Sequence, residues 1–177
     1  MIDDFALLAY KLKKIKRSGW KNKLNINDCE SVADHTYLMS ILSMIISDIQ
    51  GLDTTKIMRM ALLHDLPESI TGDIMPDQMQ KNEKILKENN AMLKILSSLP
   101  PKLEKMYFKL WKEFQEGETV EAKFVHELDK LEMVIQAKIY QRNGIDENKI
   151  KPFLDSAIND IKSDKMKEIL KKFIAEP

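Results

Sequence analysis

The sequence has few of the residues that cross-link or interrupt a polypeptide chain. It contains one cysteine, five glycines and six prolines among 177 residues. With Cys29 as the single cysteine, an intramolecular disulfide is excluded, which fits a reducing, cytoplasmic setting. No histidine lies within five residues of Cys29, so we expect it to be a buried or incidental thiol rather than a nucleophile.

Long apolar segments and an excess of one charge are also missing. No apolar run approaches the roughly 20 residues that a membrane-spanning helix needs, and residues 1–20 lack the features of a signal peptide. Lys and Arg total 28, as do Asp and Glu, so the formal net charge is zero. We therefore expect no general attraction to nucleic acid or to an anionic membrane. The length predicts one soluble domain over residues 1–177.

The apolar residues recur mostly at helical spacing, without the alternation typical of strands. In chain order, the predicted helices cover about 5–15, 28–49 or 31–49, 54–66, 78–97, 101–115, 118–142 and 152–174, with a break left open in the last. Pro67 is expected to end or kink the third of these, because proline cannot donate a backbone hydrogen bond. The segment 18–28 is predicted to be a loop. The pattern therefore indicates an all-α fold.

Three separate segments place titratable residues in apolar surroundings. His35 lies in ESVADH, the pair His64–Asp65 ends the apolar run MRMALL, and Asp129 lies in HELDKLEM. Imidazole nitrogens and carboxylate oxygens bind divalent ions such as Mn, Fe, Co, Ni and Zn. A carboxylate buried beside LLHDL also needs a compensating partner, which a metal ion provides. Two histidines and two carboxylates could thus enclose one ion in the middle of a helical bundle.

Two further residues lie close to Asp129 along the same predicted helix. His126 precedes Asp129 by three residues and could chelate a metal with it. We expect His126 at the surface instead, because it begins a charged His-Glu pair. Glu132 follows Asp129 by three residues, and the sequence assigns it no role.

The order H…HD…D resembles the ligand pattern of the HD-domain phosphohydrolase superfamily. Four blocks are similar to its 5′-deoxynucleotidase branch, namely KRSGW, ESVADHTYLMS, ALLHDLPESITGDI and AKFVHELDKLEMVIQA. They occur in the family's order and span most of the chain. The resemblance implies a helical HD-domain bundle with a central metal site, a homodimer, and hydrolysis of deoxynucleoside 5′-monophosphates.

The resemblance also implies roles for individual residues. The implied ligands of a divalent ion (Mn, Co, Fe, Ni, Zn or Mg) are His35, His64, Asp65 and Asp129. The implied catalytic residues are Glu68 and Asp73. The implied substrate contacts are Arg17, Trp20, Asp73, Ile74, Met75 and Pro76.

Elementary chemistry is consistent with these roles. Zinc lowers the pKa of bound water toward about 7, and a carboxylate such as Glu68 could then orient that water or take its proton. Arg17 could hold phosphate oxygens in its planar fork, while Trp20 could pack on the sugar or base, or anchor a loop. Two alternatives stay open. The chain could hydrolyse triphosphates, cyclic dinucleotides or alarmones, or it could be a non-catalytic helical dimerisation module with a structural metal.

Overall fold

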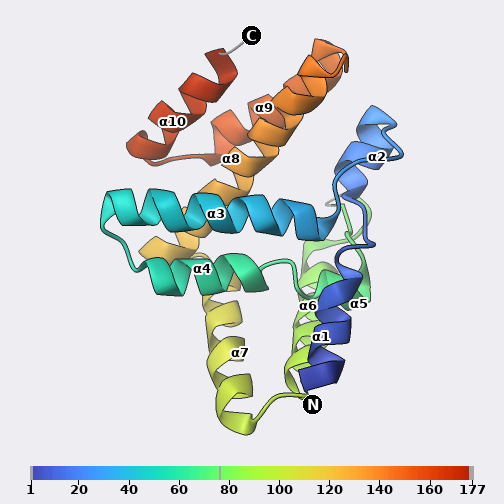
Figure 1. The fold of residues 1–177 in the computed structure, drawn as a ribbon, viewed down its shortest axis with the longest axis vertical. Helices are drawn as coiled ribbons and strands as arrows, with labels where there is room; N and C mark the ends of the chain where they lie inside the picture. Colours follow the sequence, from blue (N-terminus) through green and yellow to red (C-terminus); the bar gives the residue numbers. More distant parts are fainter. Residues whose placement is uncertain (1, 76, 176–177) are drawn as a thin grey trace.

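The computed structural model describes residues 2–75 and 77–175. In chain order the helices are α1 Ile2–Lys11, α2 Ser18–Leu24, α3 Val32–Gln50, α4 Thr54–Leu63, α5 Glu68–Thr71, α6 Lys81–Leu96, α7 Pro101–Glu116, α8 Val120–Arg142, α9 Glu147–Asp160 and α10 Asp164–Ala175 (Figure 1). Over the described residues, strand-like pairing is confined to an isolated bridge between Lys16 and Ser31. The all-α prediction is therefore confirmed. Among these helices, none combines the length and hydropathy required to span a lipid bilayer.

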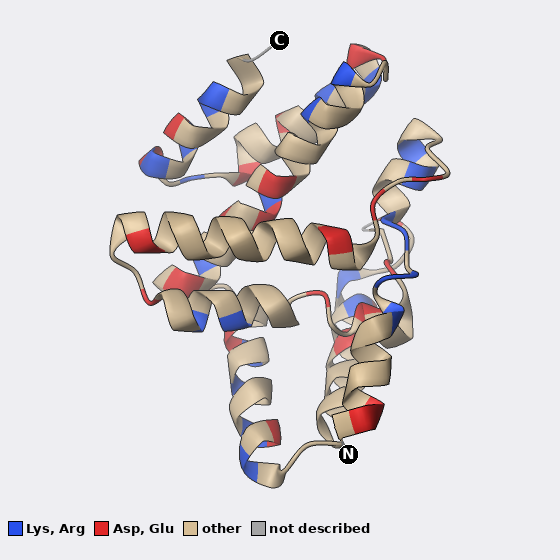
Figure 2. Ribbon diagram, viewed as in Figure 1, with Lys and Arg blue, Asp and Glu red and all other residues tan. Residues whose placement is uncertain are grey.

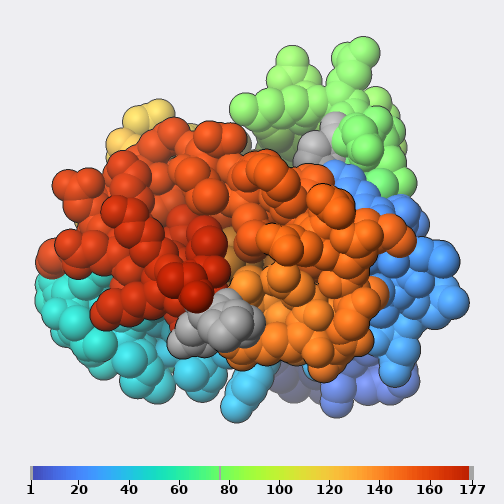
Figure 3. Space-filling view, turned by 90° about the horizontal axis from the view of Figure 1, so that it is seen from above, coloured from blue at the N-terminus to red at the C-terminus, as the bar shows by residue number. Residues whose placement is uncertain are grey.

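The centre of the molecule lies where α3 and α4 pack against each other and against the long helix α8 (Figure 1). Met39 from α3, Ile57 and Met60 from α4, and Leu128 and Leu131 from α8 are all buried there. Removing each such side chain from water is worth roughly 1.5–3 kcal/mol. Helices α9 and α10 cover one end of the molecule, as the view from above shows (Figure 3). The core thus holds three helices in fixed positions around one point.

Local capping explains where the central helices begin and end. The Ser31 side chain accepts a hydrogen bond from the Asp34 backbone N–H, and the Asp34 carboxylate accepts one from the Ser31 backbone N–H, which forms a capping box. The start of the second predicted helix is therefore Ser31 and not Asp28. Gly51 ends α3 in the left-handed conformation, φ 68°. The Asp53 side chain caps α4 by accepting from the Lys56 N–H.

The prediction of a loop over residues 18–28 is wrong for most of that segment, because Ser18–Leu24 form α2. Trp20 and Leu24 lie four residues apart on one face of α2, and both are buried. They pack in a second apolar cluster with Cys29 and with residues of α8 and α9. Tertiary burial therefore stabilises a short helix that its own sequence does not indicate. The expectation of a buried Cys29 is confirmed.

The last predicted helix is broken into two, and it begins earlier than expected. Helix α9 starts at Glu147, five residues before Pro152, which lies inside it. The break follows at Ile161, whose backbone is extended (φ −75°, ψ 119°). The Glu127 carboxylate of α8 accepts hydrogen bonds from the backbone N–H groups of Lys162 and Ser163. A half-buried carboxylate of another helix thus fixes the turn between α9 and α10.

Candidate metal centre and adjoining pocket

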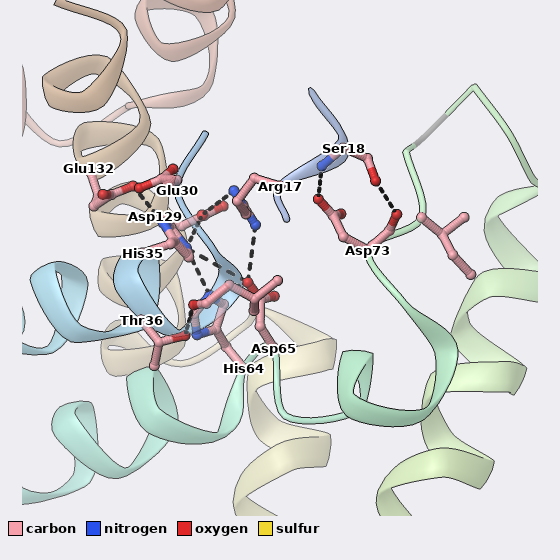
Figure 4. Close-up of polar contacts among 12 residues, drawn as sticks. Arg17, Ser18, Glu30, His35, Thr36, His64, Asp65, Asp73, Asp129 and Glu132 are labelled. Carbon is pink, nitrogen blue, oxygen red and sulfur yellow. Dashed lines mark hydrogen bonds and ion pairs between the residues drawn. The ribbon is translucent and has the colours of Figure 1, made fainter. Parts of the chain in front are cut away.

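Two histidine rings meet at the centre of the bundle. His35 lies on α3, His64 is the C-cap residue of α4, and their Nε2 atoms are 3.2 Å apart (Figure 4). The other nitrogen of each ring is engaged, since His35 Nδ1 lies 2.5 Å from Glu132 Oε2 and His64 Nδ1 lies 2.6 Å from the Ala61 carbonyl oxygen. Carboxylate and carbonyl oxygens only accept hydrogen bonds, so each Nδ1 carries a proton. In the neutral tautomers both Nε2 lone pairs therefore face the same point.

Two carboxylates complete this cluster. Asp65 Oδ2 lies 3.1 Å from His64 Nε2 and 3.7 Å from His35 Nε2. Asp129 Oδ1 lies 3.3 Å from His35 Nε2. Donor atoms of His35, His64 and Asp129 all lie within 4.8 Å of one another. The fold therefore brings together the four residues that the sequence singles out, across 94 positions from His35 to Asp129.

This arrangement fits a divalent cation. Two neutral imidazole nitrogens 3.2 Å apart would repel each other through their lone pairs unless a cation or a proton lay between them. Two nitrogens and two carboxylate oxygens form a donor set for borderline or hard divalent ions. Outer partners that fix the tautomer of each ring, here Glu132 and Ala61 O, are typical of metal-ligating histidines. His35, His64, Asp65 and Asp129 are thus the residues that would hold the ion.

The pKa shifts of His35, Asp65 and Asp129 also indicate that the cluster stabilises positive charge. Burial and the charge of Arg17 disfavour the charged form of His35, but its hydrogen bonds with Asp129 and Glu132 raise its pKa to about 10. Burial opposes ionisation of Asp65, yet the neighbouring His64 and Arg17 hold the pKa of that carboxyl below its usual range. Burial likewise opposes ionisation of Asp129, whose pKa is held low by His35 and Arg17. Both aspartates therefore remain anionic and available as ligands.

Arg17 provides a positive side chain beside the cluster. Its Nη1 atom donates to Asp65 Oδ2 at 3.1 Å, and its Nη2 atom lies 3.9 Å from Asp129 Oδ1 (Figure 4). Burial opposes the charge, but Asp65 and Asp129 raise the pKa of the guanidinium further above its ordinary value. Arg17 is therefore a permanent cation at the edge of the proposed metal centre.

Glu68 lies in a tight turn rather than on a continuation of α4. Helix α4 ends at Leu63, and Glu68 begins the single turn of α5 after Pro67. Its side chain is buried, with 5% of the residue exposed, and its Oε2 atom has no hydrogen-bond partner in the described part of the chain. Burial first, and then the charges of Asp65 and Asp73, raise the pKa of the carboxyl well above its ordinary value. Glu68 is therefore a buried carboxyl group, and its carboxylate is a stronger base than that of a solvent-exposed glutamate.

A pocket of about 350 Å³ opens directly beside the cluster. Of the residues predicted to bind substrate or to act in catalysis, those that line the pocket are Arg17, Trp20, Glu68, Asp73, Ile74 and Met75. Asp65 and Asp129 of the cluster line it as well. Pro76, also predicted to contact substrate, lies outside the described residues. The predicted residues thus surround one cavity adjacent to the proposed metal centre.

Trp20 is mostly committed to the protein interior. Only 2% of the residue is exposed, and its ring lies 4.4 Å from the Phe153 ring and 5.4 Å from the Tyr140 ring, between centroids. Its Nε1 donates to Glu30 Oε1 at 2.6 Å. These contacts fit an anchor for α2 better than a platform for a nucleobase.

The sequence did not indicate several residues of the pocket wall. Lys84 of α6, Met133 of α8 and Phe153 of α9 all line it. Each resembles an ordinary surface or core residue in its local sequence, so only the fold reveals its place. His126, in contrast, is exposed and lies away from the cluster, with its Nε2 2.9 Å from the Phe114 carbonyl oxygen. The prediction that His126 is a surface residue is confirmed.

These features agree with what the chain is similar to. A model of the HD domain family matches residues 9–172, so the chain belongs to this family. A human protein named 5′-deoxynucleotidase HDDC2 is 36% identical over 173 residues, covering 97% of this chain and 84% of the human protein. The Danio rerio protein of that name is 44% identical over 138 residues, covering 77% and 68%. A crystal structure of a Pyrococcus horikoshii protein has a TM-score of 0.81 at 27% identity, covering 98% of both chains.

Proposed function

We propose that this chain is a metal-dependent 5′-deoxynucleotidase, which hydrolyses deoxynucleoside 5′-monophosphates to a deoxynucleoside and inorganic phosphate. The observation that carries the proposal is the cluster of His35, His64, Asp65 and Asp129, two of which, Asp65 and Asp129, also line a pocket. The names of the human and Danio rerio relatives support the substrate class.

In this proposal each residue has one task. His35, His64, Asp65 and Asp129 would hold the ion, which would supply Lewis-acid stabilisation of the phosphate and a more acidic water. Glu68 takes the proton of the attacking water, whose oxygen bonds to phosphorus as the bond from phosphorus to O5′ breaks. The proton can then pass to O5′ of the leaving deoxynucleoside. Arg17 neutralises charge on the phosphate oxygens.

The shape of the pocket supports a mononucleotide. Its volume of about 350 Å³ lies at the lower end of the range for small-molecule sites. The lining combines Arg17 and several carboxylates with the apolar side chains of Met133 and Phe153. A phosphate fits the charged part, which we call the phosphate end, and a sugar or base fits the apolar part. Such a pocket favours a mononucleotide over a cyclic dinucleotide. We further propose that Asp73, Ile74, Met75 and Pro76 contribute to the nucleotide site, and that Trp20 supports it by anchoring α2.

We also propose that residues 1–177 form one HD domain that assembles as a homodimer in the cytoplasm. The homodimer is supported by an apolar stripe on α3, made of Tyr37, Ile41, Ile45 and Ile49, all of them exposed. Along most of its length α3 carries no charged residue (Figure 2). The buried Cys29 supports the location. Light scattering should give a mass twice the 20.6 kDa of one chain. The substitution Ile45→Lys should shift the measured mass toward that of the monomer.

The test of the activity is phosphate release from dCMP, dAMP and dUMP and from their ribose counterparts. Each substrate is incubated with Mn²⁺, Co²⁺ or Mg²⁺, and with EDTA. We expect release from the deoxynucleotides with at least one metal and none with EDTA. Failure of every metal-loaded form on all three deoxynucleotides would contradict the proposed activity.

A further inference from the structure

Two segments that contribute residues to the pocket lining are joined by a reciprocal pair of hydrogen bonds. The backbone N–H of Ser18 donates to Asp73 Oδ2 at 2.6 Å, and the Ser18 hydroxyl donates to the Asp73 carbonyl oxygen at 2.7 Å (Figure 4). The two residues are 55 positions apart in the chain. Ser18 therefore links the start of α2 to the loop after α5, and we call this pair the Ser18–Asp73 clamp.

The clamp provides a hydrogen-bond acceptor at the beginning of α2, which the N-cap residue of this helix does not provide. Arg17 is the N-cap residue of α2, and its own side chain makes no capping hydrogen bond. A helix of seven residues is too short to be stable from its backbone hydrogen bonds alone. The Asp73 carboxylate accepts from the N–H of Ser18, the first of the helix N–H groups that have no partner within the helix. The beginning of α2 thus depends on a residue of the opposite loop.

The clamp also determines where Arg17 stands. On one side, the Arg17 backbone N–H donates to the Glu30 carbonyl oxygen at 3.1 Å. On the other side, the next residue is Ser18, which the clamp holds. Between these two anchors the Arg17 guanidinium reaches Asp65 at 3.1 Å. A shift of the Ser18 backbone would therefore move the positive group that faces the phosphate end of the pocket.

The same hydrogen bonds hold the loop that carries Asp73. Gly72 precedes it with φ 75°, a conformation that side-chain-bearing residues rarely adopt. Beyond it, Lys84 donates to the Ile74 carbonyl oxygen at 2.9 Å. Asp73 lines the pocket, and within residues 2–75 and 77–175 its side chain accepts a hydrogen bond only through Oδ2. Ser18 thus fixes the orientation of a carboxylate whose second oxygen remains for a ligand.

We propose that Ser18 is a positioning residue, which fixes Arg17 and Asp73 relative to each other so that both face one bound phosphomonoester. This inference rests on the proposed function, because it concerns the same pocket. Ser18 itself does not line the pocket. It acts through Arg17 and Asp73, so the loss of its hydrogen bonds should weaken substrate binding and leave the metal ligands in place.

Three substitutions separate the parts of the clamp. Ser18→Thr keeps both hydrogen bonds. Ser18→Ala removes only the hydroxyl. Ser18→Pro removes both donors, and it suits the backbone because proline is favoured at the first position of a helix and Arg17 is already extended (φ −63°, ψ 109°). The matched control is Val120→Pro, at the first position of α8, where the preceding Thr119 is extended as well (ψ 159°). Val120 is exposed and is not among the residues lining the pocket.

We expect Ser18→Ala to raise KM about fivefold, the size of one ordinary hydrogen bond, and Ser18→Pro to raise it more than tenfold. Ser18→Thr and Val120→Pro should keep the wild-type KM, and all four should bind Mn²⁺ with wild-type affinity. A purely structural role would lower the active fraction, so kcat would fall while KM stayed constant. A lower kcat with an unchanged KM, or wild-type kinetics in both Ser18→Ala and Ser18→Pro, would overturn the proposal. Should Ser18→Pro not fold, the comparison of Ser18→Ala with Ser18→Thr decides by the same criteria.

A second readout does not depend on the substrate. Titration of the Mn²⁺-loaded proteins with inorganic phosphate should show weaker binding in Ser18→Ala than in Ser18→Thr. Amide hydrogen exchange over residues 72–75 should also be faster in Ser18→Ala than in Ser18→Thr. If wild-type protein releases no phosphate from deoxynucleotides, the proposed function fails while these two measurements still test the clamp. Equal phosphate affinity and equal exchange in both variants would refute the clamp alone.

Discussion

Replacing Asp129 by asparagine removes one charge from the proposed metal centre and keeps the size of the side chain. Asp129 Oδ1 lies 3.3 Å from His35 Nε2, and Asp129 is the ligand that comes from α8. A ligand that binds only the folded protein stabilises it by about 4.1 kcal/mol when its concentration is roughly 1,000 times Kd. If losing Asp129 weakens binding on the order of 100-fold, the stabilisation at that concentration falls to about 1.4 kcal/mol.

The assay is thermal unfolding of both proteins with and without Mn²⁺ or Co²⁺. The difference of about 2.7 kcal/mol in metal-linked stability corresponds to a loss of roughly 5–11 °C in the metal-induced shift for a chain of this length. Without metal, the variant should also lose some stability. Although burial opposes the charge, His35 and Arg17 favour the anion and hold the pKa of Asp129 low, so asparagine forgoes that attraction. Equal metal-induced shifts in the two proteins would remove Asp129 from the centre and refute this reasoning.

Three other predictions follow from the same geometry. Excess EDTA should abolish both bound metal and phosphate release; full turnover with metal content verified as nil would rule out a metal mechanism. Glu68→Gln should retain the metal and lose turnover by about 10²- to 10⁴-fold, the usual range for a group that transfers a proton; loss of the metal, seen by elemental analysis, would show that Glu68 has another role. Glu132→Gln should weaken metal binding about 10- to 100-fold in a calorimetric titration, since Glu132 accepts from His35 Nδ1 at 2.5 Å. Unchanged affinity would contradict that assignment.

The long helices could be predicted because their stability is encoded locally. Apolar spacing and caps such as Ser31 and Gly51 place α3 within a residue or two of its observed bounds. The sequence SGWKNKL of α2 carries no such signal, and its stability comes from burying Trp20 and Leu24 and from the Asp73 carboxylate. The break before α10 also depends on a partner far along the chain, Glu127. Elements that need distant partners cannot be read from local pattern.

The candidate ligands could be predicted for a related physical reason. A histidine and an aspartate at the end of an apolar run would be costly without a partner, so their sequence context already implies one. Lys84 and Phe153 carry no comparable cost, because a lysine on a charged helix and a phenylalanine on an amphipathic helix are stable in many surroundings. Their place on the pocket wall becomes evident only when α6 and α9 are placed around it.

His126 and Glu132 show where spacing alone stops being informative. Each lies three residues from Asp129 on α8, in opposite directions, so each is rotated by about 60° from it around the helix. His35 touches both Asp129 and Glu132, through Nε2 at 3.3 Å and Nδ1 at 2.5 Å, so α8 turns the side between those two carboxylates toward α3. His126 then lies about 90° away from that side and roughly 9 Å along the axis from Glu132. The spacing is symmetric about Asp129, and only the position of His35 on another helix decides which neighbour belongs to the centre.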